Sequence, residues 1–107
     1  MNMERNDTNR GFARYQFTDR SGAKCSLQKS SLAFEDAIWL GVMDANPQVM
    51  AREAESVGVL TRETTGWVPY PIPEKVLLTT RMHLTQEQVI ELLPLLQHFA
   101  ETGELPE

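Results

Sequence analysis

The last quarter of the chain carries the start and stop signals of a single amphipathic helix. Thr85 stands where a helix N-cap is expected, and Gln88 completes a capping box three residues later. Gly103 suits the end of the helix, because glycine accepts the positive φ of that position. Pro94 predicts a kink or a break inside the segment, since proline cannot donate to the carbonyl of Ile90. The rest of the chain must therefore provide the surface on which one long helix packs.

This predicted helix carries more apolar surface than one small sheet can cover. A sheet buries one side of a helix, and the apolar positions here extend beyond one side. They are Val89, Ile90, Leu92, Leu93, Leu95, Leu96, Phe99 and Ala100. The surplus leaves two alternatives open, which are a contact with a second subunit and a place in the core of one chain.

Upstream of the helix, alternating residues predict a β-hairpin over residues 11–29. Ala13, Tyr15 and Phe17 fall on one face of its first half, which is the period of a half-buried strand. Residues 19–22 supply turn chemistry and end on a glycine that accepts positive φ. The alternation resumes after this turn, so the two runs form a pair of antiparallel strands.

Two further strands and a short helix complete the predicted fold. Residues 37–43 form an apolar run that indicates a largely buried strand, and residues 75–83 indicate the last strand. Residues 48–56 are rich in helix formers and predict a short helix. Alternate prolines in residues 67–73 predict an edge strand or an extended covering segment, because proline cannot donate to a ladder. The fold class is α+β, with a small antiparallel β-sheet packed against a C-terminal α-helix.

Length and composition favour one domain over residues 1–107. The hydrophobic share of 41% and the charged share of 23% suit a globular core. Residues 1–10 are polar and lack periodicity, so we expect a mobile arm or a short ordered lead-in. The one cysteine cannot form an intrachain disulfide and favours a reducing cytoplasm. No apolar run reaches the length of a membrane helix, so we expect no membrane partner.

The charge of the chain is uneven. Residues 1–30 contain six Lys and Arg against three Asp and Glu, whereas the remaining residues contain four against twelve. The net charge of −5 argues against nonspecific nucleic-acid binding, and we expect no specific DNA or RNA partner. A basic N-terminal third can dock an anion or pair with another subunit. The alternative is a solvated strand face.

The chain lacks the spacing that a metal site or a catalytic dyad requires. His83, His98 and Cys25 form no pair at zinc-binding spacing. Cys25 alternates with Leu27 on the expected core face, where a thiol is usually inert. The adjacent carboxylates at positions 35–36 point apart in a strand. We therefore expect no metal, no cofactor and no enzymatic activity.

The remaining chemistry is that of a binding site. On the last predicted strand, Arg81 and His83 share a face with Thr79. The three offer a guanidinium fork, an imidazole and a hydroxyl to one anion. The alternative is that Arg81 pairs with a carboxylate at the start of the helix, such as Glu87.

A second polar cluster lies at the end of the predicted hairpin. Its members are Ser26, Gln28, Ser30 and Ser31. Such a set can bond a sugar or the edge of a base, and the alternative is plain turn chemistry. Trp39 can stack on a base, and the alternative is a place in the core.

Several motifs resemble a family of small phage and prophage proteins. The first part of the signature comprises RGF at 10–12, CSLQ-x-SS at 25–31 and IWLG at 38–41. The second part comprises TRMHL at 80–84, LLPLL at 92–96 and ETGEL at 101–105. Together these motifs cover residues 10–43 and 66–105, and their order is specific. The pattern is similar to the first class of phage Thoeris anti-defence proteins.

The resemblance implies a function without catalysis. Proteins of that class are oligomeric sponges that sequester cyclic ADP-ribose-type signals, and in some members cyclic oligonucleotides, without cleaving them. It implies an N-terminal sheet, C-terminal helical elements, pockets at subunit interfaces and a homo-oligomer in the host cytoplasm, with a hexamer as a candidate size. Residues 48–56 and the loop before Trp67 have no counterpart in the pattern.

On the matching positions, one set of residues is expected to bind the ligand. The set is Arg10, Arg14, Gln28, Ser30, Ser31, Trp39, Arg81 and His83. The leading hypothesis is a phage counter-defence protein that binds a cyclic nucleotide-type signal. The main alternative is a protein–protein inhibitor of a host defence complex, similar to an anti-CRISPR, and a third is a hydrolase that degrades the signal.

Overall fold

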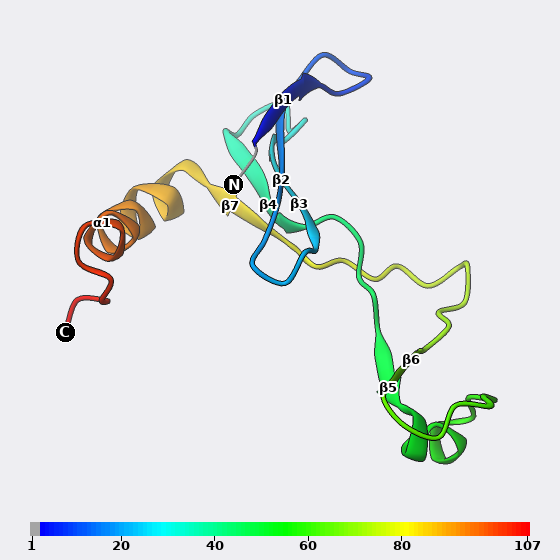
Figure 1. The fold of residues 1–107 in the computed structure, drawn as a ribbon. Coiled ribbons are helices and arrows are strands. Elements are labelled where there is room, and N and C mark those ends of the chain that lie inside the picture. The colour runs from blue at the N-terminus through cyan, green and yellow to red at the C-terminus, as the bar shows by residue number, and fades with distance from the viewer. Residues whose placement is uncertain (1–2) are drawn as a thin grey trace. The chain divides into compact units, whose positions relative to one another are not determined.

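The structure, a computed structural model, describes residues 3–107 and divides them into two compact units (Figure 1). The first, here called the sheet unit, comprises the chain up to Met43 together with Arg81–Glu107. The second, the insert unit, comprises Asp44–Thr80. Units defined by contacts need not fold independently, so the single domain over residues 1–107 stays a prediction.

A five-stranded antiparallel sheet forms the centre of the sheet unit. Its strands lie in the order β1-β2-β3-β4-β7, and each neighbouring pair is antiparallel. They are β1 Glu4–Asp7, β2 Ala13–Thr18, β3 Lys24–Lys29, β4 Ala37–Val42 and β7 Arg81–Thr85. Together with the C-terminal helix α1, Gln86–Thr102, this sheet confirms the predicted α+β class.

The predicted hairpin over residues 11–29 is confirmed as β2 and β3. Asp19 fixes its turn, because one oxygen of its carboxylate accepts hydrogen bonds from the backbone N–H groups of Ser21 and Ala23. Gly22 takes a φ of 87° in the same turn, a conformation that favours glycine. Both features were present in the sequence as turn chemistry.

The sequence left a mobile arm or an ordered lead-in open for residues 1–10, and strand β1 distinguishes the two over Glu4–Asp7. Residues Glu4–Asp7 pair with β2 along the edge of the sheet, so this part of the predicted arm over 1–10 is an ordered lead-in. Residues 1–2 of that arm lie outside the described residues. The lead-in adds a fifth strand that hydrophobic alternation does not predict, because an edge strand with a polar face shows little periodicity.

The last strand is shorter than the predicted strand over residues 75–83 and begins at Arg81. Residues Arg81 through Thr85 pair with β4 from Gly41 back to Ala37. Because β4 ends at Val42, the ladder cannot continue far upstream of Arg81. The prediction is therefore right for residues 81–83 and wrong for the stretch before them.

The insert unit contains a small two-stranded sheet, and the predicted helix over residues 48–56 is wrong. The first residues of this stretch, Gln48–Met50, pair with Trp67–Pro69, and the pairing holds them in extended geometry. The strand expected in residues 67–73 is present over Trp67–Pro69 and does not extend beyond them. The elements are β5 Gln48–Met50, the 3₁₀ turns η1 Ala51–Glu53 and η2 Glu55–Val57, and β6 Trp67–Pro69. A small core joins them, made by Ala51, Ala54 and Val68 with Val49 and Val59.

Helix α1 begins and ends where its sequence signals predict. The Thr85 hydroxyl accepts from the backbone N–H of Gln88 at 3.1 Å, and the Gln88 side chain accepts from the N–H of Thr85 at 2.9 Å. Gly103 takes a φ of 79° at the other end. Pro94 does not break the helix, and Ile90, whose carbonyl loses its donor, is exposed to water. No helix within residues 3–107 is long and apolar enough to cross a membrane.

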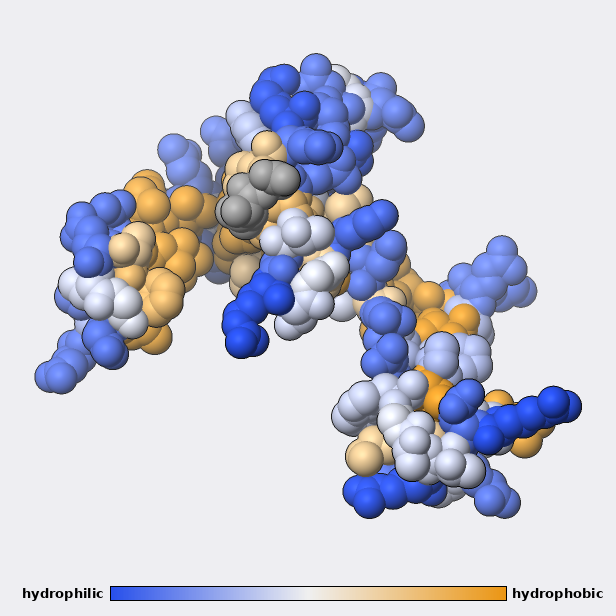
Figure 2. Space-filling view, in the orientation of Figure 1, coloured by the Kyte–Doolittle hydropathy of each residue, from blue (hydrophilic) through white to orange (hydrophobic). Residues whose placement is uncertain are grey.

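Cross-strand register gives the sheet one polar and one apolar face. The apolar face carries Tyr15, Phe17, Cys25, Leu27, Ile38, Leu40, Val42, Met82 and Leu84. Helix α1 adds a second apolar surface, since none of its residues is buried and Leu93, Leu96 and Phe99 are about half exposed. Figure 2 shows hydrophobic residues gathered along one side of this helix.

Replacing Thr85 by alanine tests the contribution of the cap. The change removes the hydroxyl acceptor and leaves the backbone N–H of Gln88 without its partner. We expect the free energy of unfolding, measured by urea titration, to fall by about 1 kcal/mol. Thr65→Ala in the exposed loop of the insert unit is the matched control, with an expected change below about 0.5 kcal/mol. Equal losses in the two variants would contradict a capping role.

Candidate functional site

Two adjacent rows of directly paired residues cross the polar face of the sheet. The first row contains Asn6, Arg14, Gln28, Trp39 and His83. The second row contains Glu4, Gln16, Ser26, Gly41 and Arg81. Directly paired residues of antiparallel strands share a face, so these side chains project from one surface. The register thereby brings residues from both ends of the chain into one place.

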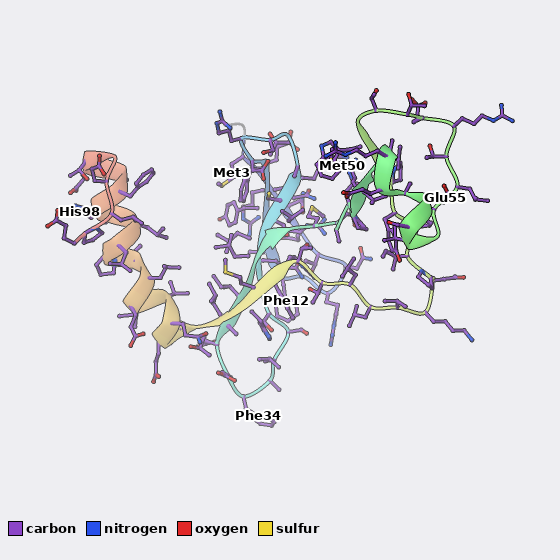
Figure 3. The ribbon with its side chains drawn as sticks, turned by 90° about the horizontal axis from the view of Figure 1, so that it is seen from below. Met3, Phe12, Phe34, Met50, Glu55 and His98 are labelled. Atoms are coloured by element: carbon purple, nitrogen blue, oxygen red, sulfur yellow. The ribbon has the colours of Figure 1, made fainter. Side chains whose placement is uncertain are left out.

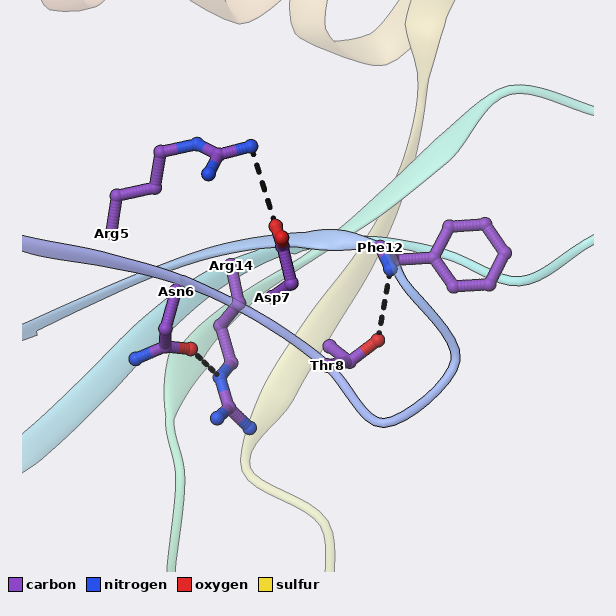
Figure 4. Close-up of polar contacts among 6 residues, drawn as sticks. All are labelled: Arg5, Asn6, Asp7, Thr8, Phe12 and Arg14. Atoms are coloured by element: carbon purple, nitrogen blue, oxygen red, sulfur yellow. Dashed lines mark hydrogen bonds and ion pairs between the residues drawn. The ribbon is translucent and has the colours of Figure 1, made fainter.

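Arg14 is held in position by the edge strand. Its Nε–H donates to Oδ1 of Asn6 at 2.8 Å (Figure 4). The amide of Asn6 donates in turn to Oε1 of Gln16 at 2.7 Å. The Nε–H is one of five guanidinium donors, so the four N–H groups on the terminal nitrogens stay available to an anion. On the opposite face of the same edge strand, Arg5 pairs with Asp7 at 3.3 Å.

Trp39 and His83 form a stacked aromatic pair in the middle of the polar face. Their ring centroids lie 3.8 Å apart and their planes differ by 5°. Nε2 of His83 lies 2.9 Å from the hydroxyl of Ser30, a residue that is almost fully buried. The stack and this hydrogen bond together fix the orientation of both rings.

The guanidinium of Arg81 lies over the Trp39 ring of this pair. Its Nη1 donates to Oε1 of Gln28 at 3.3 Å, and its Cζ lies 5.1 Å from the centre of the Trp39 ring. A guanidinium at this distance from an indole forms a cation–π contact. Within residues 3–107 the ion pairs are Arg5–Asp7 and Lys29–Asp36, so the carboxylate of Glu87 is not the partner of Arg81 in the described part of the chain.

An open cleft of about 520 Å³ lies at the edge of this cluster. Three cationic side chains and no carboxylate contribute to its lining. The lining residues are Thr8, Asn9, Arg10, Phe12, Arg14, Gln28, Lys29, Ser31 and Trp39. The cleft therefore offers positive charge, amide and hydroxyl groups, and an aromatic ring to one ligand.

The eight residues predicted from the sequence lie together in the structure. Five of them, Arg10, Arg14, Gln28, Ser31 and Trp39, line the cleft. Two of the other three contact members of this set, because Arg81 bonds to Gln28 and His83 stacks on Trp39. The third, Ser30, bonds to the ring of His83. Thr79, which was expected to share a strand face with Arg81 and His83, lies outside β7.

Sequence reasoning missed the contribution of the turn between β1 and β2. Thr8, Asn9 and Phe12 line the cleft from this turn. The turn is fixed by a bond of 3.1 Å from the backbone N–H of Phe12 to the Thr8 hydroxyl (Figure 4), and by a φ of 83° at Gly11. Gly11 is a sequence signal for a tight turn. It predicts a hairpin only where a strand precedes it, and the polar residues Glu4–Asp7 do not show the pattern of a strand.

Lys29 is the third cation of the lining, and its charge is shared. Its Nζ lies 2.7 Å from Oδ1 of Asp36. The hydrogen bond from Lys29 and its positive charge lower the pKa of the Asp36 carboxyl below its ordinary value. Arg10 and Arg14 therefore carry most of the charge that the cleft can offer to an anion.

Cys25 and His83 do not lie together as a nucleophile and a base would need to. Cys25 is buried on the apolar face, where its Sγ–H donates to the carbonyl of Ala23 at 3.5 Å. His83 lies on the opposite, polar face. Among residues 3–107 no three His, Cys, Asp or Glu side chains gather as a metal site would require.

Comparison of the chain with protein-family models, with curated proteins and with solved structures finds no match. A cluster of guanidinium groups, amides, hydroxyls and a stacked indole suits a ligand that joins negative charge to a planar ring.

The lowered pKa of Asp36 gives a prediction with a defined sign. A carboxylate with a lowered pKa in the folded state stabilises the fold above its unfolded pKa of about 3.9, and this contribution is lost as the pH falls through the folded-state pKa. Asp36→Asn should therefore lower the melting temperature at pH 7, by a small amount because the pair is exposed. The difference from the unmodified protein should shrink as the pH falls below the unfolded pKa, as circular dichroism melts over a pH series would show. A difference of the same size at pH 2 and pH 7 would contradict the assignment, and Lys29→Met should remove the same pH dependence.

Proposed function

We propose that the protein binds a cyclic nucleotide-type signal in the cleft of its polar face and withholds it without cleaving it. The signal is similar to cyclic ADP-ribose or to a cyclic oligonucleotide, and the role is that of a phage counter-defence protein. One observation carries the proposal: eight residues chosen for this chemistry from the sequence form one contiguous cluster around a cationic cleft.

The composition of the cleft supports a nucleotide in particular. Arg10 and Arg14 face it without a carboxylate in the lining, and a guanidinium binds a phosphate by two parallel hydrogen bonds. Trp39 adds its indole to the lining, and a base would stack on the part of this ring that His83 and Arg81 leave uncovered, a contact typically worth about 1–3 kcal/mol. Gln28 and Ser31 supply the groups that hydrogen-bond to a sugar or to the edge of a base.

The chemical groups of the cluster support retention of the ligand and not its turnover. Its groups are hydrogen-bond donors and acceptors and fixed positive charges, which stabilise a bound anion in its ground state. His83 is the one imidazole of the cluster, and its stack on Trp39 and its bond to Ser30 fix it within the sheet. Uniform binding of this kind gives affinity without catalysis.

A homo-oligomer is the second part of the proposal. The sheet unit has two apolar surfaces, a half-buried one on the sheet with Met82 exposed and a half-exposed one on α1. Phe34 adds a fully exposed aromatic side chain at the tip of the loop between β3 and β4 (Figure 3). Exposed apolar surface of this extent is typical of a subunit interface. Repeated copies would also multiply the number of binding sites in each assembly.

Arg81 gives the test of the ligand site. Arg81→Ala removes the charge over Trp39 and the donor to Gln28, and it leaves the apolar face unchanged. With cyclic ADP-ribose as the probe, isothermal titration calorimetry should show a loss of about 2 kcal/mol in binding free energy, as for a charge-assisted hydrogen bond. Arg81→Lys should restore only part of it, because an ammonium lacks the planar fork.

The control for this test is Arg62→Ala, which removes an equal charge from an exposed loop of the insert unit. It should bind the probe as the unmodified protein does. An Arg81→Ala protein with an unchanged melting temperature and undiminished affinity would remove Arg81 from the site. An unmodified protein that binds neither cyclic ADP-ribose nor a cyclic oligonucleotide would overturn the proposed function.

Leu96 gives the test of assembly. Leu96→Glu places a charge in the half-exposed apolar side of α1, and burial of an unpaired charge in an interface costs several kcal/mol. We expect multi-angle light scattering to show an oligomer for the unmodified protein and a smaller species for the variant. Leu60→Glu, at an almost fully exposed leucine of the insert unit, is the matched control. A monomeric unmodified protein would contradict assembly.

A further inference from the structure

Gly41 occupies an unusual position in the middle of the polar face. It stands directly between Ser26 of β3 and Arg81 of β7 in the second row. Its φ of 148° lies in a region that residues with a Cβ rarely adopt. Ser26 beside it is 0% exposed, and its hydroxyl has no hydrogen-bond partner among the described residues. The two smallest residues of the polar face are therefore neighbours.

The contact between Arg81 and Gln28 has to cross β4. Arg81 starts from β7 and Gln28 from β3, so their backbones are separated by two strand spacings, about 9–10 Å in all. On the polar face of β4, the residues that this contact must pass are Trp39 and Gly41. The Trp39 ring is already stacked on His83, so the open passage lies over Gly41.

We propose that Gly41 and Ser26 are positioning residues that form a trough across the polar face, through which the side chain of Arg81 reaches Gln28 and the ring of Trp39. A Cβ on Gly41 would stand in this passage, and a larger side chain at Ser26 would raise its floor. The small size of both residues, together with the backbone conformation of Gly41, sets where the guanidinium lies. The consequence for binding rests on the proposed function, whereas the consequence for the position of Arg81 does not.

The position of Arg81 is measured directly by NMR of its side chain. The indole ring current of Trp39 should shift the δ and ε signals of Arg81 upfield of their random-coil values in the unmodified protein. Gly41→Ala should return these signals toward random-coil values. Gly22→Ala is the matched control, because it imposes the same kind of strain at a φ of 87° in the turn of the hairpin, with open space around the new methyl group. It should leave the Arg81 signals in place.

Ser26 provides a second pair of variants for the case in which Gly41→Ala does not fold. Ser26→Thr adds one methyl group at a residue with ordinary strand geometry and should displace the Arg81 signals. Ser26→Ala removes only the unpartnered oxygen and should leave them shifted upfield. A folded Gly41→Ala protein with unchanged Arg81 signals would overturn the proposal. If that variant is unfolded, unchanged signals in Ser26→Thr would overturn it.

A binding measurement separates this inference from the proposed function. With cyclic ADP-ribose as the probe, Gly41→Ala should weaken binding at least tenfold, and in an Arg81→Ala background the same change should add little, because both act through one guanidinium. Full additivity of the two changes would contradict a positioning role. A probe that does not bind the unmodified protein would count against the proposed function alone, because the NMR comparison is made without ligand.

Discussion

The register across β2, β3, β4 and β7 is the constraint on which both faces of the sheet depend. It places Arg14, Gln28, Trp39 and His83 in one line, each directly opposite the next. A slip of one residue in any strand would move that strand's whole set of side chains to the other face. The cationic cleft and the apolar face are therefore two consequences of one pattern of hydrogen bonds.

Trp39 contacts residues of the C-terminal strand β7 and lines the cleft beside residues of the N-terminal strands. His83 stacks on its ring, Arg81 lies over it, and the ring also lines the cleft. Two hydrogen bonds join β3 and the residue after it to β7, each between residues 53 positions apart in the sequence. Contacts of such long range cost loop-closure entropy, because the intervening chain must be closed into a loop to form them. The site is thus complete only when the C-terminal strand has joined the sheet.

The elements that the sequence predicts well are those with local signals. The cap at Thr85, the end of α1 at Gly103 and the turn at Asp19 each depend on a few adjacent residues, and the structure has all three. The errors come from pairing with distant partners. Residues 48–56 prefer a helix by composition, but the first three pair with Trp67–Pro69 and the rest form 3₁₀ turns. The start of β7 is set by where β4 ends.

The eight residues predicted from the sequence lie together in the structure, but the sequence did not predict the contacts that join them. Alternation placed Arg81 and His83 on one face of a strand, and their stack and bonds to residues of β3 and β4 depend on a register that no single segment contains. Thr8, Asn9 and Phe12 were missed because β1 shows no hydrophobic period. The suggestion of a structural carboxylate partner for Arg81 had equal support in the sequence, and only the cross-strand neighbours show Gln28 in that place.

The central claim is that this protein holds its signal and does not convert it. The most direct measurement incubates the purified protein with cyclic ADP-ribose, removes the unbound nucleotide by gel filtration, denatures the protein by heat and examines the released small molecules by mass spectrometry. The account predicts that the nucleotide travels with the protein and is released intact at the mass of the added compound. Release of an opened or hydrolysed product would contradict it, and so would a protein fraction that carries no nucleotide at all.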